Sequence, residues 1–331
     1  MTHARLLSLT LGLAWAGSAL PAFALPLSPE GIMRAREHLT FQGTLLVTQG
    51  AKRQRIRVTQ GEGQRQREEF LGPQGEVQDL VVSDGQVRWH HAPSRQAVRV
   101  AQVAPEGGLQ QRIALLKANY KFQVQGQLQH LGRLVLLTQF VPRHPGNLTH
   151  RLWVDQQTQL PLVVERRDPA GALVDRSEFT QIAFDPPMTG KPFLFQLPDG
   201  CKVGSNTTVL AQGDGWTAPP RGLAWRPEPP KDLPAGYRLI HWQYFLDPKG
   251  VKTFAWRFHD GLNLVSCFAT DVRSLPAAPA GAGTVAIGGG TGYEVAQGAK
   301  RLLAWPAGPT GYTLIGHLPA EQLRQVAGST R

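Results

Sequence analysis

One stretch of the sequence, residues 150–166 with the letters HRLWVDQQTQLPLVVER, constrains the fold more than any other. In its first half Leu152 and Val154 alternate with polar or aromatic neighbours, and from residue 160 onward the second half alternates in the same way. Successive side chains of a strand point to opposite faces, so each half offers one apolar face. The polar residues 156–159 supply a turn. The stretch therefore predicts a β-hairpin within a large amphipathic sheet.

The rest of the chain also favours strands. Its 331 residues include 36 glycines and 26 prolines, which favour turns between short elements. The length allows two domains at roughly 100–200 residues each. Helices are predicted near residues 28–40, with Ser28 as the N-cap, at 108–119 and from Pro319 onward. Strand candidates lie at residues 41–47, 53–58, 80–83, 87–91, 120–124, 132–140, 172–184, 237–244, 252–258, 262–270, 300–305 and 312–317.

The first residues have the pattern of a secretory signal peptide. An apolar run at residues 6–20 follows a weakly basic start, and Ala22-Phe23-Ala24 fits the small-x-small cleavage pattern. The alternative is an uncleaved membrane anchor, but the apolar run is shorter than the ~20 residues of a spanning helix. We therefore expect residues 1–24 to be removed after Ala24 and the mature protein to be periplasmic.

The chain is strongly basic. Its formal net charge is +11. Arg5 is the only Lys, Arg, Asp or Glu among residues 1–24, so removal of that segment leaves a net charge of +10. A protein of this charge attracts nucleic acid, anionic lipid or acidic protein segments. Export disfavours nucleic acid, so lipid and acidic peptide remain as partners.

One predicted strand collects its arginines on a single face. Arg53, Arg55 and Arg57 alternate with uncharged residues and therefore point the same way. Such a face is often a solvated surface, and the functional alternative is a docking surface for acidic groups. The sequence leaves both interpretations open.

The composition changes between residues 201 and 231. Five prolines between residues 219 and 230 indicate an extended linker, and we expect Trp216 and Trp225 to pin it onto one of the domains. The expected organisation is a signal peptide (1–24), an N-terminal domain (25–200), a linker (201–231) and a smaller C-terminal domain (232–331). Within the last, the Pro-, Ala- and Gly-rich residues 274–292 are expected to form a mobile loop.

Sequence patterns typical of enzymes are missing. The chain has no G-x-S-x-G, H-E-x-x-H or C-x-x-C. His90 and His91 are adjacent in a predicted strand, so they point to opposite faces and cannot both bind one metal from it. We expect no catalytic residue, no metal site and no cofactor.

Cys201 and Cys267 are the only cysteines. An oxidising compartment permits a disulfide between them, and two free, buried thiols are the alternative. A disulfide needs its two Cα atoms within about 7 Å, which the sequence does not give. The oligomeric state, a homo-oligomer included, also stays open.

Short motifs follow one another in a set order along the chain. Their order, together with the signal peptide, the linker and the second domain, resembles the periplasmic sigma-E regulatory proteins of the RseB/MucB type over most of the mature chain. The N-terminal motifs are Phe41-Gln42-Gly43-Thr44, Ser83-Asp84-Gly85 with Trp89 and Pro93, and Leu152-Trp153-Val154-Asp155 with Leu160-Pro161-Leu162. The C-terminal motifs are Leu233-Pro234-Ala235-Gly236-Tyr237, His259-Asp260-Gly261-Leu262 with Ser266 and Phe268, and Gly316-His317-Leu318-Pro319.

The resemblance implies a fold and an activity. The fold is α+β but mostly β: an N-terminal domain similar to the lipoprotein carriers LolA and LolB, and a smaller sheet-based C-terminal domain. The N-terminal domain would be a curved, incompletely closed antiparallel sheet with covering helices. The implied activity is regulatory and not enzymatic. Such a protein binds the periplasmic segment of a membrane anti-sigma factor, shields it from proteolysis, and is released by envelope lipid or lipopolysaccharide.

Two functions compete on this basis. In a regulator, a hydrophobic cavity under the sheet would hold acyl chains, with ~0.8 kcal/mol for each buried CH₂ group. Trp89, Tyr120 and Trp153 are the candidate cavity residues, and for each the alternative is an ordinary aromatic core residue. The competing function is a periplasmic lipid or lipoprotein carrier. A carrier has no need of the second domain and the tryptophan-bearing linker, so we expect the regulator.

Overall fold

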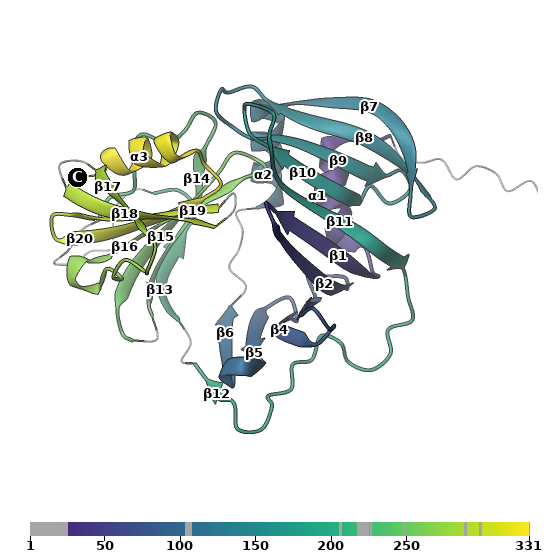
Figure 1. Cartoon of the computed structure of the whole chain (residues 1–331), viewed down its shortest axis with the longest axis horizontal. Coiled ribbons are helices and arrows are strands. Elements are labelled where there is room, and N and C mark those ends of the chain that lie inside the picture. Colours follow the sequence, from purple (N-terminus) through teal and green to yellow (C-terminus); the bar gives the residue numbers. More distant parts are fainter. Residues whose placement is uncertain are drawn as a thin grey trace, which may run out of the picture.

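The computed structural model describes residues 26–102, 108–204, 207–216, 225, 227–247, 249–287, 290–297 and 300–330. These residues form two β-sheets and three α-helices (Figure 1). The expected signal peptide and its cleavage site after Ala24 lie outside the described residues.

The N-terminal part forms a 12-stranded sheet, here called sheet A. Its strands are β1 (Phe41–Gln49), β2 (Lys52–Gln60), β3 (Gln66–Leu71), β4 (Val77–Ser83), β5 (Val87–Ala92), β6 (Ala97–Gln102), β7 (Tyr120–His130), β8 (Arg133–Pro142), β9 (Thr149–Asp155), β10 (Pro161–Arg167), β11 (Leu173–Phe184) and β12 (Lys202–Val203). They lie in the order β12-β6-β5-β4-β3-β2-β1-β11-β10-β9-β8-β7. Pairing is antiparallel except between β12 and β6. The sheet is strongly curved and does not close, because β7 and β12 are its two ends (Figure 1).

The hairpin expected at residues 150–166 is confirmed as β9 and β10. The two strands pair antiparallel, with Leu152 opposite Val164 and Trp153 opposite Val163. Leu152 and Val154 are buried, as their alternation predicts.

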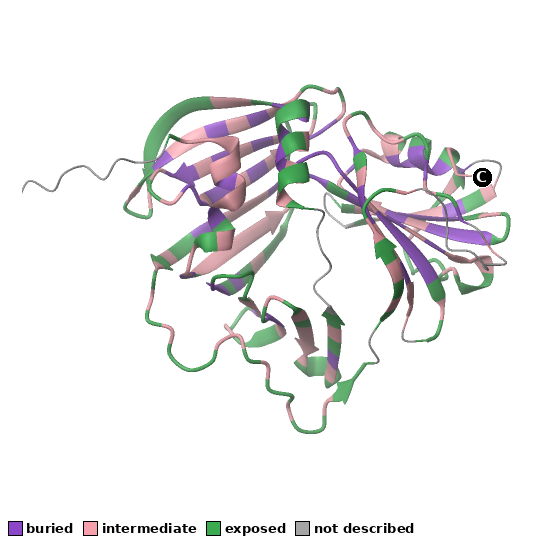
Figure 2. Ribbon diagram, turned by 180° about the vertical axis from the view of Figure 1, so that it is seen from behind, coloured by how far each residue is buried: buried purple, intermediate pink, exposed green. Residues whose placement is uncertain are grey.

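Two helices, α1 (Pro29–His38) and α2 (Leu109–Asn119), cover one face of sheet A (Figure 2). The first begins at the expected cap, where the Ser28 hydroxyl accepts a hydrogen bond of 3.0 Å from the Gly31 N–H. We call the covered face the inner face and the opposite one the outer face. The buried side chains between these helices and the sheet include Ile32, Leu116, Tyr120, Phe140, Leu152 and Val154.

The C-terminal part forms an 8-stranded sheet, sheet B, with the order β13-β14-β15-β16-β20-β19-β18-β17. Its strands are β13 (Thr208–Gly213), β14 (Arg238–Leu246), β15 (Lys252–His259), β16 (Leu264–Asp271), β17 (Gly283–Ile287), β18 (Gly290–Gln297), β19 (Lys300–Ala307) and β20 (Thr310–Gly316). Helix α3 (Ala320–Gly328) packs on this sheet through Leu323 and Val326, which confirms the expected last helix. Short 3₁₀ helices lie at Pro93–Arg95 and Val272–Ser274. The core of this part includes Phe254, Trp256, Trp305, Tyr312 and Leu314.

The range expected to be a linker contains two strands. Its start joins sheet A as β12, and β13 joins sheet B. The prolines begin only at residue 219, so composition does not oppose strands before that point. Trp216 packs edge-to-face on Trp242 and Trp256, with ring centroids 5.4 Å apart in both pairs, and Trp225 donates a hydrogen bond of 2.6 Å to Thr310 Oγ1. Both linker tryptophans therefore pack against the second domain.

The prediction of a mobile loop at residues 274–292 is wrong for the second half of that range. There β17 and the start of β18 form an edge hairpin, with Val285 opposite Gly292. A Cβ atom on Gly292 would lie 2.5 Å from the carbonyl oxygen of Ala304. The neighbouring strand packs so closely that only glycine fits at this position. Judged by composition alone, the same glycine indicates a loop.

The predicted fold class is confirmed. The chain is mostly β, with a curved open sheet covered by helices on one side and a second, separate sheet. Within the described part of the chain, none of the helices has the length and apolar character needed to cross a membrane.

Candidate functional site

The arginines predicted to share a face do so on β2. Arg53, Arg55 and Arg57 are exposed, whereas Ile56 and Val58 are buried in the core that includes Ala35 of α1. The arginines therefore lie on the outer face of sheet A. A docking role for them stays a prediction.

Neighbouring groups hold two of these arginines in place. Arg57 forms an ion pair of 2.5 Å with Glu69 of β3, and Arg55 donates hydrogen bonds of 3.2 Å to the carbonyl oxygens of Gly72 and Pro73. The Arg57 side chain is still 57% exposed, compared with 12% for Glu69. The carboxylate lies close to the sheet and the guanidinium extends beyond it.

The cationic row continues across the sheet. Thr48 of β1 is opposite both Arg53 and Arg176, and Glu165 of β10 is opposite both Arg176 and Arg151. Directly opposed residues project from the same face. Together the five side chains Arg53, Arg55, Arg57, Arg151 and Arg176 form what we call the arginine face.

Trp153 lies within the arginine face. It alternates with Leu152 and Val154, which contact the helix-side core, so its ring points to the outer face. The Arg176 and Arg151 guanidinium carbons lie 5.1 and 5.9 Å from the ring centroid, within cation–π range. This candidate cavity residue thus lies beside the arginines, and its buried part packs against the core cluster that also includes Val135 and Leu160.

The other two candidate cavity residues lie elsewhere. Trp89 of β5 stacks on Phe195 of the segment after β11, with centroids 6.0 Å apart and an interplanar angle of 12°. Tyr120 is buried at the start of β7, edge-to-face with Phe140 and His150. The structure therefore does not bring Trp89, Tyr120 and Trp153 together, and a role in lipid binding stays a prediction for each.

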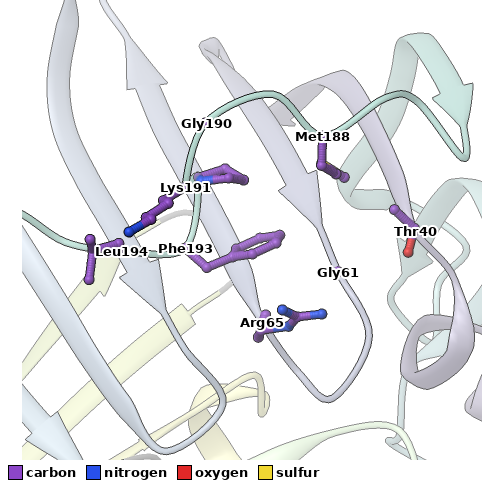
Figure 3. A pocket seen from close by; sticks show the side chains of 9 residues that line it. Thr40, Gly61, Arg65, Met188, Gly190, Lys191, Phe193 and Leu194 are labelled. Carbon is purple, nitrogen blue, oxygen red and sulfur yellow. The ribbon is translucent and has the colours of Figure 1, made fainter.

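A pocket of about 330 Å³ lies where the segment after β11 crosses the β2–β3 connection (Figure 3). It combines two cations, Arg65 and Lys191, with the ring of Phe193, and the Arg65 guanidinium carbon is 5.3 Å from the centroid of that ring. The complete lining is Thr40, Gly61, Arg65, Met188, Gly190, Lys191, Pro192, Phe193 and Leu194. Apolar walls beside two positive charges suit an amphiphilic anion.

The two sheets meet at a buried polar junction. The Tyr120 hydroxyl donates a hydrogen bond of 2.6 Å to Asp260 Oδ2, and Asn263 Nδ2 donates one of 2.9 Å to the Tyr120 oxygen. A ring nitrogen of His150, Nε2, lies 3.1 Å from Asn263 Oδ1. Asn119 Nδ2 donates to the carbonyl oxygen of Asp260 at 2.8 Å. We call these five side chains, Asn119, Tyr120, His150, Asp260 and Asn263, the domain junction.

Burial perturbs the titrating groups of the domain junction. It lowers the pKa of His150 to about 4, an effect that the nearby Asp260 carboxylate only partly opposes. Burial likewise raises the pKa of Tyr120 well above its usual range, and the adjacent Asp260 charge acts in the same direction. Both side chains are therefore neutral at neutral pH.

Sequence reasoning did not identify the domain junction. Asp260-Gly261 reads as a turn, and the carboxylate does accept hydrogen bonds of 2.8 and 2.7 Å from the N–H groups of Leu262 and Asn263. That local role hides the second one, since its other oxygen reaches across to Tyr120. Polar residues at positions expected to be buried, such as His150 beside Leu152, are the signal that points to such a contact.

Both cysteines are free thiols. Cys201 Sγ lies 3.6 Å from His91 Nε2, and Cys267 is buried in the core of sheet B, where burial raises its thiol pKa. The structure therefore has no disulfide between them, and of the two free thiols only Cys267 is buried, whereas Cys201 is half-buried. No group of three or more His, Cys, Asp or Glu residues is arranged around a metal-sized space in the part of the chain that the structure describes.

Comparisons with known proteins give one family. The sequence-family model of the MucB/RseB N-terminal domain matches residues 30–196. Solved structures of similar fold include MucB in complex with MucA(peri), at 19% identity and a TM-score of 0.58, covering 91% of this chain and 96% of that chain. The complex of Pseudomonas aeruginosa MucA and MucB is also 19% identical, with a TM-score of 0.59 and the same coverage.

A crystal structure of MucB is 18% identical with a TM-score of 0.56, covering 91% of this chain and 95% of that chain. At these identities the structural likeness concerns the fold. A comparison with curated protein sequences finds no match. The family model covers half of the sequence and confirms the resemblance seen in its motifs: the chain belongs to the MucB/RseB family.

Proposed function

We propose that this protein is a periplasmic regulator of an extracytoplasmic-stress sigma factor. It binds the periplasmic segment of a membrane anti-sigma factor, shields that segment from proteolysis, and releases it when envelope lipid binds. It acts by binding alone and catalyses no reaction.

One observation supports this proposal most directly. The fold shared with MucB extends over 91% of this chain and includes both sheets, and in that structure MucB is in complex with MucA(peri). A carrier of lipid or lipoprotein would use sheet A alone, whereas here Trp216 and Trp225 attach the connecting segment firmly to sheet B. The proposal keeps the domain division at residues 25–200, 201–231 and 232–331, with β13 as a contribution to the second domain.

The pocket of Figure 3 is the proposed site for the releasing lipid. Its volume of about 330 Å³ is at the small end of ligand sites and would hold a charged headgroup with the first part of an acyl chain. Arg65 and Lys191 would bind the anionic group, and Phe193, Met188 and Leu194 would contact the hydrocarbon.

A binding and protection assay tests the proposal. The anti-sigma segment is taken from the gene beside an extracytoplasmic sigma factor and mixed with the purified protein at low salt, where charged surfaces act most strongly. We expect a complex, slower cleavage of the bound segment by an added protease, and release on titration with lipopolysaccharide. The change K191E should raise the lipid concentration needed for release and leave the complex itself intact.

The outcomes separate the alternatives. Absence of a complex at low salt contradicts the regulator. Lipid binding without any complex favours the carrier instead. The change K249E, on an exposed lysine of the second domain, is the matched control, and it should leave lipid release unchanged.

A further inference from the structure

We infer that the arginine face docks the protein on an anionic phospholipid membrane. This goes beyond the binding of a peptide partner and does not depend on it. The surface is the outer face of sheet A around Arg53, Arg55, Arg57, Arg151 and Arg176, and the partner chemistry is a bilayer surface rich in anionic lipid headgroups.

The arginines on this face outnumber its carboxylates. Three carboxylates, from Glu69, Glu165 and Glu178, also project from it and form ion pairs with the arginines. Two of them are more buried than their partners: Glu165 is 7% exposed where Arg176 is 30% exposed, and Glu69 is 12% exposed where Arg57 is 57% exposed. Glu178, at 26%, is almost as exposed as Arg176. Five arginines therefore face three carboxylates, two of which are largely buried, and the surface that meets an approaching membrane has a net positive charge. The whole chain is also strongly positive, with a formal net charge of +11.

The shape favours a membrane over a peptide. The row from Arg53 to Arg151 crosses β2, β1, β11, β10 and β9, four strand spacings or roughly 19 Å at ~4.8 Å each. All five strands are paired on both sides, so their backbone groups cannot accept an added peptide strand. A partner can therefore contact only the side chains of this face. Because these are spread over a broad area, an array of lipid headgroups can bind several of them at once.

Trp153 gives the face a second feature of membrane-surface proteins. Its half-buried indole lies among the arginines, with Arg176 at 5.1 Å and Arg151 at 5.9 Å from the ring centroid. Tryptophan favours the interface between headgroups and hydrocarbon because its ring is largely apolar and carries one N–H donor. The inner face stays turned away from the membrane in this orientation, since the helices lie on the opposite side of the sheet.

Docking would have a consequence for any membrane-anchored partner. Two proteins confined to the same surface meet at a raised effective concentration, without any new contact between them. A modest membrane affinity therefore strengthens binding to a partner in that membrane.

Vesicle sedimentation tests the inference. The purified protein is mixed at low salt with vesicles of phosphatidylcholine alone or of phosphatidylcholine with phosphatidylglycerol. We expect binding only to the anionic vesicles and a decline with added salt. The triple variant R53Q/R55Q/R57Q should bind about 100-fold more weakly, because each cation near an anionic surface contributes ~1 kcal/mol and 1.4 kcal/mol corresponds to a factor of ten.

A matched variant distinguishes the face from net charge. K231Q/K249Q/K300Q removes the same charge from three exposed lysines, one at the end of the linker and two in the second domain. It should retain most of the binding. Equal losses in the two triple variants, or no binding to anionic vesicles at all, would overturn the inference. So would a triple arginine variant that keeps its vesicle binding, or one that loses the anti-sigma segment in the absence of vesicles, since the face would then be a peptide site.

Discussion

His150 shows how one residue can carry both a contact and a pH dependence. It is 6% exposed, its Nε2 faces Asn263 Oδ1 at 3.1 Å, and burial lowers its pKa to about 4. The unfolded chain has an ordinary histidine pKa near 6.5. Above pH 6.5 both states hold the neutral ring, so this residue gives no pH dependence there.

Between pH 6.5 and about 4, the His150 ring is protonated in the unfolded state but stays neutral in the folded state. Folding stability should therefore fall as the pH drops from about 6.5 to about 4 and level off below that, with a loss of roughly 2–4 kcal/mol from this residue. Denaturant unfolding of the wild type and of H150Q across this range measures it. The amide of glutamine keeps a hydrogen-bond donor but does not titrate, so the variant should show a shallower decline.

His317 provides the control for that comparison. Burial lowers its pKa to about 4 as well, so it produces a decline of the same sign in both proteins. Only the difference between the two curves belongs to His150. Identical curves would show that its ring titrates alike in the folded and unfolded states.

At the scale of elements, the β15–β16 turn is packed directly on helix α2. Gly261 in this turn has φ +112°, a conformation that residues with a side chain rarely adopt. A Cβ atom there would lie 2.4 Å from the Leu116 backbone nitrogen and 2.5 Å from its Cα. The glycine is thus required both by the backbone angle and by the approach of the helix.

Gly261→Ala should destabilise the protein by more than the strain of the turn alone, which is of order 1–3 kcal/mol. Gly250→Ala is the matched control, because Gly250 also has a positive φ, +78°, but no atom within 4 Å of its Cβ position. Chemical denaturation of both variants measures the difference. Equal losses would mean that the contact with α2 adds nothing to the cost.

Helices and strands were predictable from the sequence where a local pattern, such as a capping residue or apolar alternation, determines them. The Ser28 cap fixed the start of α1, and the alternation around Leu152 fixed β9 and β10. The hairpin of β17 and β18 was missed because at least one of its glycines, Gly292, is required by the close approach of the neighbouring strand. A contact of that kind cannot be read from the local sequence. The domain junction was missed for the same reason: its partners are more than 100 residues apart in the chain, and no local pattern pairs Tyr120 with Asp260.

For the whole molecule, the polar domain junction decides how the two sheets are oriented. Hydrogen bonds depend on direction, so the Tyr120, Asp260 and Asn263 contacts select one arrangement of the domains where an apolar contact would allow several. Interfaces of this kind between domains are also easier to open than an apolar core. The regulator proposed above, which binds a partner and releases it, would use both properties.

Tyr120→Phe should therefore loosen the arrangement of the domains. It keeps the ring in the core of sheet A but leaves the buried Asp260 Oδ2 without its 2.6 Å donor, at a cost of about 1–3 kcal/mol. Small-angle X-ray scattering should show a larger radius of gyration and a longer maximum dimension than in the wild type. Tyr312→Phe is the control, since its hydroxyl donates to the Glu228 carbonyl oxygen at 3.1 Å, away from the junction. That variant should lose stability and keep the wild-type scattering profile, and an unchanged profile for Tyr120→Phe would show that the junction does not set the orientation.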